Sequence, residues 1–142
     1  MDYGFEILPN TADIRIKIWG RTLQELFCNA LRGMAAFVEP GTLDAARTAL
    51  KEKWDIKVEA LDLTSLFVKF LSEVIARSDT ENTVYLGARF KKFGENFLEG
   101  KLLGIKVEDG FEKEIKAVSY QEVDIKKNSE TGLYETVLVF DI

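Results

Sequence analysis

The sequence predicts an α+β fold: a single domain, residues 1–142, in which two amphipathic helices pack on a mostly antiparallel β-sheet. Residues 22–38 and 62–75 carry apolar residues at three- and four-residue spacing, the period of a helix with one buried face. Residues 14–19 alternate between apolar and basic residues up to Trp19, the pattern of a half-buried strand. Hydrophobic residues make up 46% of the chain, enough for one core of ordinary size.

The ends of the first strand and the first helix carry local signals. Gly20 ends the strand, whose three isoleucines are predicted to face inward. Thr22-Leu-Gln-Glu25 is a capping box, in which the two polar side chains satisfy free amides of the first helical turn. Pro40-Gly41 is predicted to stop this helix.

The second half of the chain is predicted to be mainly β. Residues 42–53 form either a short helix or a loop. Asp62 caps the second helix, which fades into the polar stretch 78–82. Two strands meet at a turn near Gly94-Glu95, and a later hairpin turns around residues 128–132. The strands are predicted over residues 54–60, 83–93, 96–107, 115–126 and 133–142.

The composition excludes several classes of chemistry. The chain has no His, which excludes Ser-His-Asp and Cys-His triads and imidazole metal ligands. Cys28 is the one cysteine, so no internal disulfide or cysteine zinc cluster is possible, and a small core residue is its predicted role. The net charge of −5 argues against strong direct nucleic-acid binding, although a locally basic patch remains compatible with it.

The sequence also bears on location. It begins with an acidic segment and not with a secretory signal, and no apolar run approaches the roughly 18 residues that a membrane helix needs. We therefore predict a cytoplasmic protein that does not enter a membrane. Neither a GxGxxG nor a Walker A sequence occurs, so no nucleotide site of those types is predicted.

Strand-end carboxylates are the strongest candidates for a metal site. Asp13 lies where an irregular segment meets the first strand, and Asp141 ends an apolar strand. Ile142 would supply the main-chain carboxylate next to Asp141. Such oxygens suit calcium or magnesium. The alternative for Asp13 is a solvated aspartate at a strand end. The alternative for Asp141 is a final strand that frays into solvent, and the apolar run 137–140 argues against fraying.

Other polar residues have more ordinary predicted roles. Five acids are interpreted as helix-end or turn residues: Asp44, Asp55, Asp62, Asp79 and Glu81. Tyr120 and Gln121 follow an apolar stretch, where cross-strand packing is favoured over contact with a ligand.

Several short segments, in order, resemble the archease family. Residues 10–14, Asn-Thr-Ala-Asp-Ile, are similar to its H-T-A-D-I signature, and residues 20–31 to its first helix. Residues 79–82, Asp-Thr-Glu-Asn, are similar to its D-T-E motif, which follows the second helix. Residues 114–125 resemble its E-V-K-A-V-T-Y-H segment, and the closing residues 139–142, Val-Phe-Asp-Ile, its V-x-x-D-I end. The resemblance covers nearly the whole chain.

Two positions depart from the family pattern. Asn10 stands where the first histidine is usual, and Gln121 replaces the histidine after the tyrosine. Both substitutes keep hydrogen bonding but cannot transfer protons or ligate as imidazoles do. These departures leave open that the chain is a paralogue that assists another client protein.

The resemblance implies an accessory protein and not an enzyme. Members of the family promote guanylylation and multiple turnover of the GTP-dependent RNA ligase that joins tRNA halves during tRNA splicing. By position, the resemblance implies a divalent-metal site, with calcium as the expected ion, built from Asp13, Asp141 and Ile142. The metal is expected either to be positioned near the ligase's nucleotide pocket or to brace the docking surface.

Two other functions remain alternatives. Archease-like proteins are also proposed as chaperone-like modulators of tRNA methyltransferases, a role that needs an exposed apolar patch. A small metal-dependent hydrolase is the third hypothesis, because carboxylates alone can hold a catalytic metal.

Overall fold

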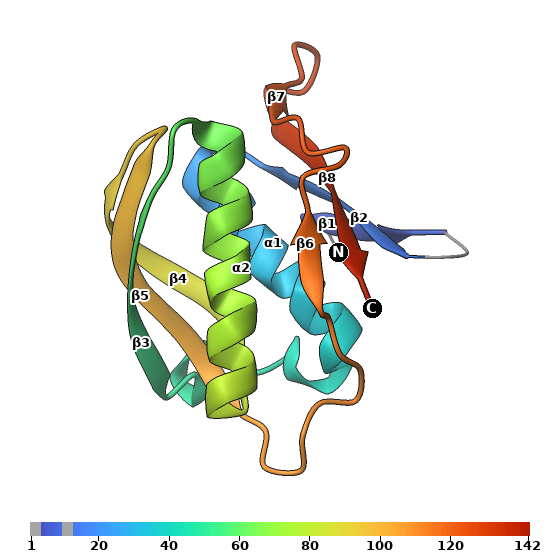
Figure 1. Cartoon of the computed structure of the whole chain (residues 1–142), viewed down its shortest axis with the longest axis vertical. Helices are drawn as coiled ribbons and strands as arrows, with labels where there is room; N and C mark the ends of the chain where they lie inside the picture. The colour runs from blue at the N-terminus through green and yellow to red at the C-terminus, as the bar shows by residue number, and fades with distance from the viewer. Residues whose placement is uncertain (1–3, 10–12) are drawn as a thin grey trace.

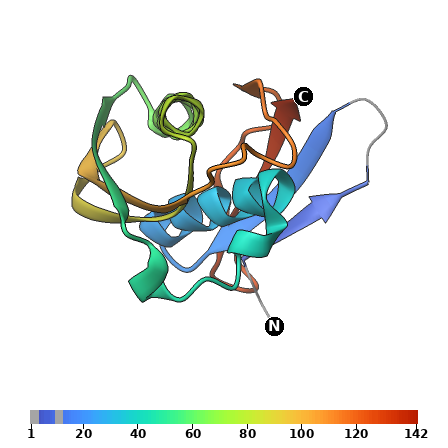
Figure 2. The same cartoon turned by 90° about the horizontal axis from the view of Figure 1, so that it is seen from below.

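The protein is described by a computed structural model that covers residues 4–9 and 13–142, and Figures 1 and 2 show it from two directions. Two antiparallel sheets enclose two α-helices. The helices are α1 (Leu23–Val38) and α2 (Leu63–Glu81). The strands are β1 (Phe5–Leu8), β2 (Ile14–Gly20), β3 (Glu52–Glu59), β4 (Thr83–Phe93), β5 (Phe97–Lys106), β6 (Ala117–Ser119), β7 (Lys126–Lys127) and β8 (Tyr134–Asp141).

The two sheets are built from different parts of the chain. One has the order β1-β2-β8-β6, with β7 also paired to β8, and the other has the order β3-β5-β4. Helix α1 contacts β2 of the first sheet and β4 of the second, while α2 contacts β3, β4 and β6. Figure 2 shows both helices in the space between the sheets. The predicted α+β domain with two helices and antiparallel sheets is confirmed.

Both helices begin at the predicted caps. The Thr22 hydroxyl accepts the amide of Glu25 at 3.0 Å, and the Asp62 carboxylate accepts the amide of Ser65 at 2.8 Å. The end of α2 differs from the prediction, because the helix continues through the polar stretch to Glu81. It ends at Asn82, whose φ of +51° is the left-handed conformation that stops a helix.

Phenylalanine rings from the helices and the second sheet make the centre of the core. Phe27 of α1 is fully buried, with its ring centroid 4.7 Å from that of Phe67 and 5.4 Å from that of Phe70, both on α2. The Phe93 ring of β4 lies 5.0 Å from it, edge on. On the first sheet, Ile16 and Ile18 face inward and are fully buried, as predicted.

The segment 115–126 is not one strand, contrary to the prediction. It contributes only β6 and β7, which pair with β8 at different places. The break lies at Glu122, whose φ of +64° turns the chain, and Val123 then enters the core. Tyr120 is 54% exposed and lies outside any strand, so the predicted cross-strand packing of Tyr120 is also wrong.

Three other segments differ in detail from the prediction. Strand β1 was not predicted; it pairs with β2 and packs Phe5 against the core. Of the two alternatives for residues 42–53, the short helix is present as a 3₁₀ helix at Arg47–Ala49, after a first one at Pro40–Thr42, and β3 begins within the segment at Glu52. Asp55 is not a turn residue, because it lies within β3 opposite Lys101. Within the described ranges, no helix has the length and apolar character to span a membrane.

Removal of the central ring should be far more costly than removal of an exposed one. We expect Phe27→Ala to lower the free energy of unfolding by about 3–5 kcal/mol, because it leaves a cavity among packed rings. Phe97→Ala is the control, since Phe97 is 40% exposed, and it should cost less than about 1 kcal/mol. Urea unfolding followed by circular dichroism measures both values, and equal losses would contradict the described core.

Candidate functional site

The pairing of β2 with β8 determines where the predicted metal ligands lie. Ile14 is opposite Phe140 in an antiparallel ladder, and both side chains belong to the core. Asp141 is the last residue of β8, and Asp13 directly precedes β2 in a bend, so the register continued by one residue would set the two opposite each other. Because side chains alternate along a strand, both carboxyl groups are directed away from the core. The two aspartates that the sequence singled out therefore flank the last pair of this ladder, Ile14 and Phe140.

The end of β8 is held on both sides and does not fray. Asp141 is paired with Ala117 of β6, and its carbonyl oxygen accepts the amide of Lys116 at 2.8 Å. Phe140 before it is fully buried, whereas the Asp141 side chain is exposed and Ile142 is 50% exposed. We call Asp13, Asp141 and Ile142 the carboxylate edge; Figure 2 shows the end of β8 beside the start of β2.

An ion pair lies next to this edge on the same side of the sheet. Arg15 is two residues from Asp13 and donates two hydrogen bonds to the Glu122 carboxylate, the one from Nε at 2.9 Å. These bonds lower the pKa of Glu122 from its ordinary value. Arg15 also lies close enough to Asp13 to attract its carboxylate. The guanidinium thus moderates the negative charge of the edge.

The two positions that depart from the family pattern are not both placed at this edge. Asn10 lies outside the described residues. Gln121 follows β6 on the side that runs away from Asp141, is exposed, and donates its amide to the Ser119 hydroxyl at 3.0 Å. The ladder therefore does not bring Gln121 to Asp141.

The donor atoms of the edge fit a hard divalent cation as a partial site. Carboxylate oxygens are the ligands that calcium and magnesium prefer, and calcium takes about 6–8 of them. Among the described residues no group of three or more His, Cys, Asp or Glu side chains could hold a metal. Asp13 and Asp141 supply fewer ligands than a closed site needs, so water or a docked protein would have to complete the shell.

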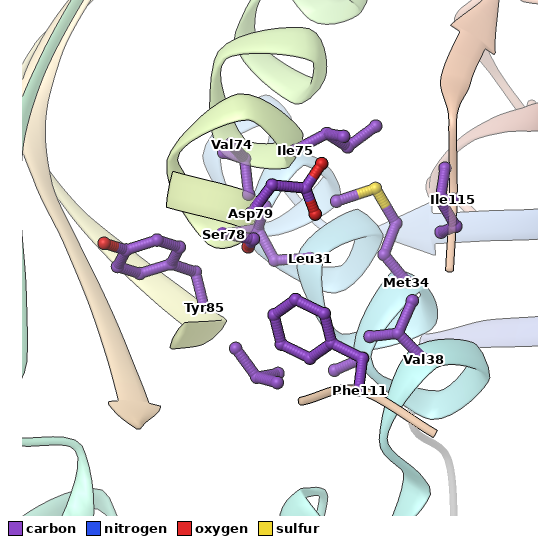
Figure 3. A pocket seen from close by; sticks show the side chains of 12 residues that line it. Leu31, Met34, Val38, Val74, Ile75, Ser78, Asp79, Tyr85, Phe111 and Ile115 are labelled. Carbon is purple, nitrogen blue, oxygen red and sulfur yellow. The ribbon is translucent and has the colours of Figure 1, made fainter. Parts of the chain in front are cut away.

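A second acidic position, Asp79, lies at the end of α2 beside a small apolar cavity. Figure 3 shows its carboxyl group close to Met34 and Ile75, with Phe111 and Ile115 lining the same cavity. The cavity has about 30 Å³, room for a water molecule and not for an organic ligand. Asp79 remains exposed at the rim, yet partial burial raises its pKa, and repulsion from Glu114 adds to the effect.

One short segment connects Asp79 with the carboxylate edge. In residues 114–116, Glu114 repels Asp79, Ile115 lines the cavity, and the Lys116 amide binds the Asp141 carbonyl. The sequence placed Asp79 at a helix end, which is confirmed, but did not predict the cavity. The sequence feature that could have drawn attention to Asp79 is its position in the last turn of a helix, where the helix dipole disfavours negative charge.

The sequence is similar to a family of proteins over nearly its whole length. The Archease protein family (MTH1598/TM1083) matches residues 5–142. A protein archease of Pyrococcus furiosus is 31% identical over 144 residues, with 97% of this chain and 98% of the relative covered. A protein archease of Aeropyrum pernix is 29% identical over 140 residues, which cover 94% and 93% of the two chains.

Solved structures share the fold. The solution structure of Methanobacterium thermoautotrophicum protein 1598 matches with a TM-score of 0.73 at 28% identity, covering 99% of both chains. The crystal structure of an archease from Thermotoga maritima, described as a possible chaperone, matches with a TM-score of 0.62 at 20% identity. That second match covers 95% of this chain and 94% of the other and concerns the fold alone.

We expect Asp79→Asn to stabilise the protein at neutral pH. The pKa of Asp79 is raised in the folded state. The protonated carboxyl group therefore contributes stability below the ordinary pKa near 3.8, and this contribution is lost as the pH rises through the pKa of the folded state. Asparagine removes the charge and its repulsion by the helix dipole, so Tm should rise by about 1–4 °C at pH 7.

Thermal unfolding at neutral pH and below the ordinary Asp79 pKa measures this difference. The gain should disappear in acid, where wild-type Asp79 is protonated. The exposed Asp44→Asn variant is the control and should leave Tm unchanged at both pH values. A loss of stability in Asp79→Asn at both pH values would mean that the carboxylate makes a contact the fold needs.

Proposed function

The chain belongs to the archease family, and on that premise we propose that it is an accessory protein, and not an enzyme, of the GTP-dependent RNA ligase in tRNA splicing. In this role it promotes guanylylation of the ligase and lets it turn over repeatedly on tRNA halves that end in a 3′-phosphate or cyclic phosphate. The observation that supports the proposal is the β2–β8 ladder, which ends at the Ile14–Phe140 pair and is flanked there by Asp13 and Asp141.

The proposed metal site follows from the carboxylate edge. Asp13, Asp141 and the main-chain carboxyl group of Ile142 would hold a divalent cation, with calcium as the first candidate. When bound, the cation supplies positive charge where the two carboxylates would otherwise repel each other. The chain's own part is to fix the position of these oxygens, through the β8 ladder on one side and the Lys116 amide on the other.

The exposure of the edge suits docking against another protein. Asp141 and Ile142 present their side chains to solvent, while the backbone of Asp141 is held by Lys116 and β6 and that of Phe140 before it by β2. A partial set of ligands on a rigid strand can be completed by groups from a docked ligase. The metal would then either be positioned near the ligase's nucleotide pocket or brace the contact between the two proteins.

The alternative is a chaperone-like role with a tRNA methyltransferase as client. It needs a contiguous exposed apolar patch. The large apolar side chains that are exposed among the described residues belong to separate elements along the chain: Ile7, Leu61, Phe97, Tyr120 and Ile142.

The proposal predicts that the two aspartates are needed for stimulation of the ligase. With limiting ligase from the same source, the wild-type chain should convert a single turnover of RNA joining into many. The variant Asp13→Asn/Asp141→Asn should lose that effect, because the amides keep the size of the side chains but remove the charge that holds a cation.

The control for this experiment is Asp44→Asn/Asp109→Asn, which changes the net charge equally at two exposed positions away from β2 and β8. It should stimulate like wild type. Full stimulation by the Asp13/Asp141 variant would refute the role of the carboxylate edge. If wild type fails to stimulate an otherwise active ligase, the function should be sought in the methyltransferase client, tested by the solubility of that client with and without this chain.

A further inference from the structure

The outer side of the second sheet concentrates basic side chains. In the register of β3, β5 and β4, three rows cross this side of the sheet: Lys57–Glu99–Lys92, Asp55–Lys101–Arg89 and Lys53–Leu103–Gly87. A bulge between Phe90 and Lys92 adds Lys91. The basic side chains of this surface, which we call the basic face, are all exposed: Lys53, Lys57, Arg89, Lys91, Lys92 and Lys101.

The charge of this face is opposite to that of the whole chain. The three rows and the bulge hold six of the 19 basic residues but only two of the 24 acidic ones, a net charge of about +4 within a chain of net charge −5. The next row, Glu59–Phe97, adds one more acid at the edge of the face. Both acids are already engaged by lysines of the face: Asp55 lies 3.2 Å from Lys101, and Glu99 lies 3.8 Å from Lys92. Four cationic side chains are therefore in excess.

The basic face is also hollowed. A depression of about 610 Å³ is lined by basic side chains from all three strands and by Gly100 at its floor. Gly100 contributes only backbone to this floor, because it pairs with Ile56 and Phe90 and its side-chain position is on the core side of the sheet. A Cβ there would lie 2.1 Å from the Arg89 carbonyl oxygen, so only glycine lets β4 and β5 approach this closely. The depression is a trough with charged sides and a backbone floor.

The character of the face favours a phosphate backbone over an acidic protein. Protein interfaces depend on buried aromatic or aliphatic anchors, whereas nucleic-acid interfaces are polar and rich in Lys and Arg. Leu103, in the third row, is only 5% exposed, and no aromatic side chain stands in the three rows; the exposed Phe97 lies in the next row, opposite Glu59. Without stacking groups within the three rows, contact there would be made to phosphates and would carry little sequence preference.

We propose that the basic face binds the phosphate backbone of RNA. That the nucleic acid is RNA rests on the proposed function; the phosphate contacts themselves rest on the charge and shape of the face. The net charge predicted that strong direct binding would be absent, and the local excess here supports a weak, salt-sensitive contact instead. Figure 2 shows the second sheet and the carboxylate edge on opposite sides of the helices, so one molecule presents both surfaces at once.

Fluorescence anisotropy of a labelled RNA hairpin, titrated with the protein at several KCl concentrations, tests the proposal. Wild type should bind at low salt. Lys53→Gln/Arg89→Gln should lower the slope of log K against log[KCl] by about 2 and weaken binding by about tenfold per lost contact near 0.1 M salt. The second double variant, Lys57→Gln/Lys91→Gln, should lower the slope and weaken binding by the same amounts. Agreement between the two variants would exclude a local structural defect in either one as the cause.

The matched control is Lys106→Gln/Lys126→Gln, which removes the same charge from exposed positions outside the basic face and should leave binding unchanged. Circular dichroism should give the wild-type melting curve for every variant. Absence of RNA binding at low salt, or equal weakening by the control, would overturn the proposal. Displacement of the RNA by poly-glutamate at equal charge concentration would also overturn it, in favour of an acidic protein partner. Ligase stimulation by a chain that binds no RNA would overturn this inference alone and leave the proposed function standing.

Discussion

The pairing of β2 with β8 is the constraint on which the candidate site depends. Seven residue pairs join the two strands, and a slip of one residue would turn every side chain to the opposite face. The register is fixed because the inward positions are completely buried. Those positions are Ile16, Ile18, Leu138 and Phe140. The packing of the core thus fixes Ile14 opposite Phe140, and Asp13 and Asp141 are the chain neighbours of that pair, although 127 residues separate them in the sequence.

The molecule keeps opposite charges on opposite sides of one core. The aromatic cluster around Phe27 ties α1 and α2 to the second sheet, while α1 also packs on β2 of the first. The carboxylate edge lies on the first sheet and the basic face on the second. A net charge of −5 describes neither surface, which is why composition alone is a poor guide to the partners of such a chain.

Local signals predicted those elements whose causes are local. The caps at Thr22 and Asp62 and the apolar periodicity of both helices are readable within one or two turns, and both caps are present. The break at Glu122 was not predicted, because it depends on Val123 entering a core made by distant elements. For the site, the sequence identified the two aspartates, but their neighbours across the sheet follow only from the pairing of β6 and β8. The basic face was missed for the same reason, since its rows join three strands.

Isothermal titration calorimetry with calcium measures whether the carboxylate edge binds a divalent cation. The metal-free wild-type chain should bind one calcium ion, and Asp13→Asn/Asp141→Asn should bind none, while Asp44→Asn/Asp109→Asn should bind like wild type. Magnesium should be titrated in parallel to establish which ion the edge prefers. Equal calcium binding by wild type and the Asp13/Asp141 variant, or no binding of either ion by wild type, would contradict the account.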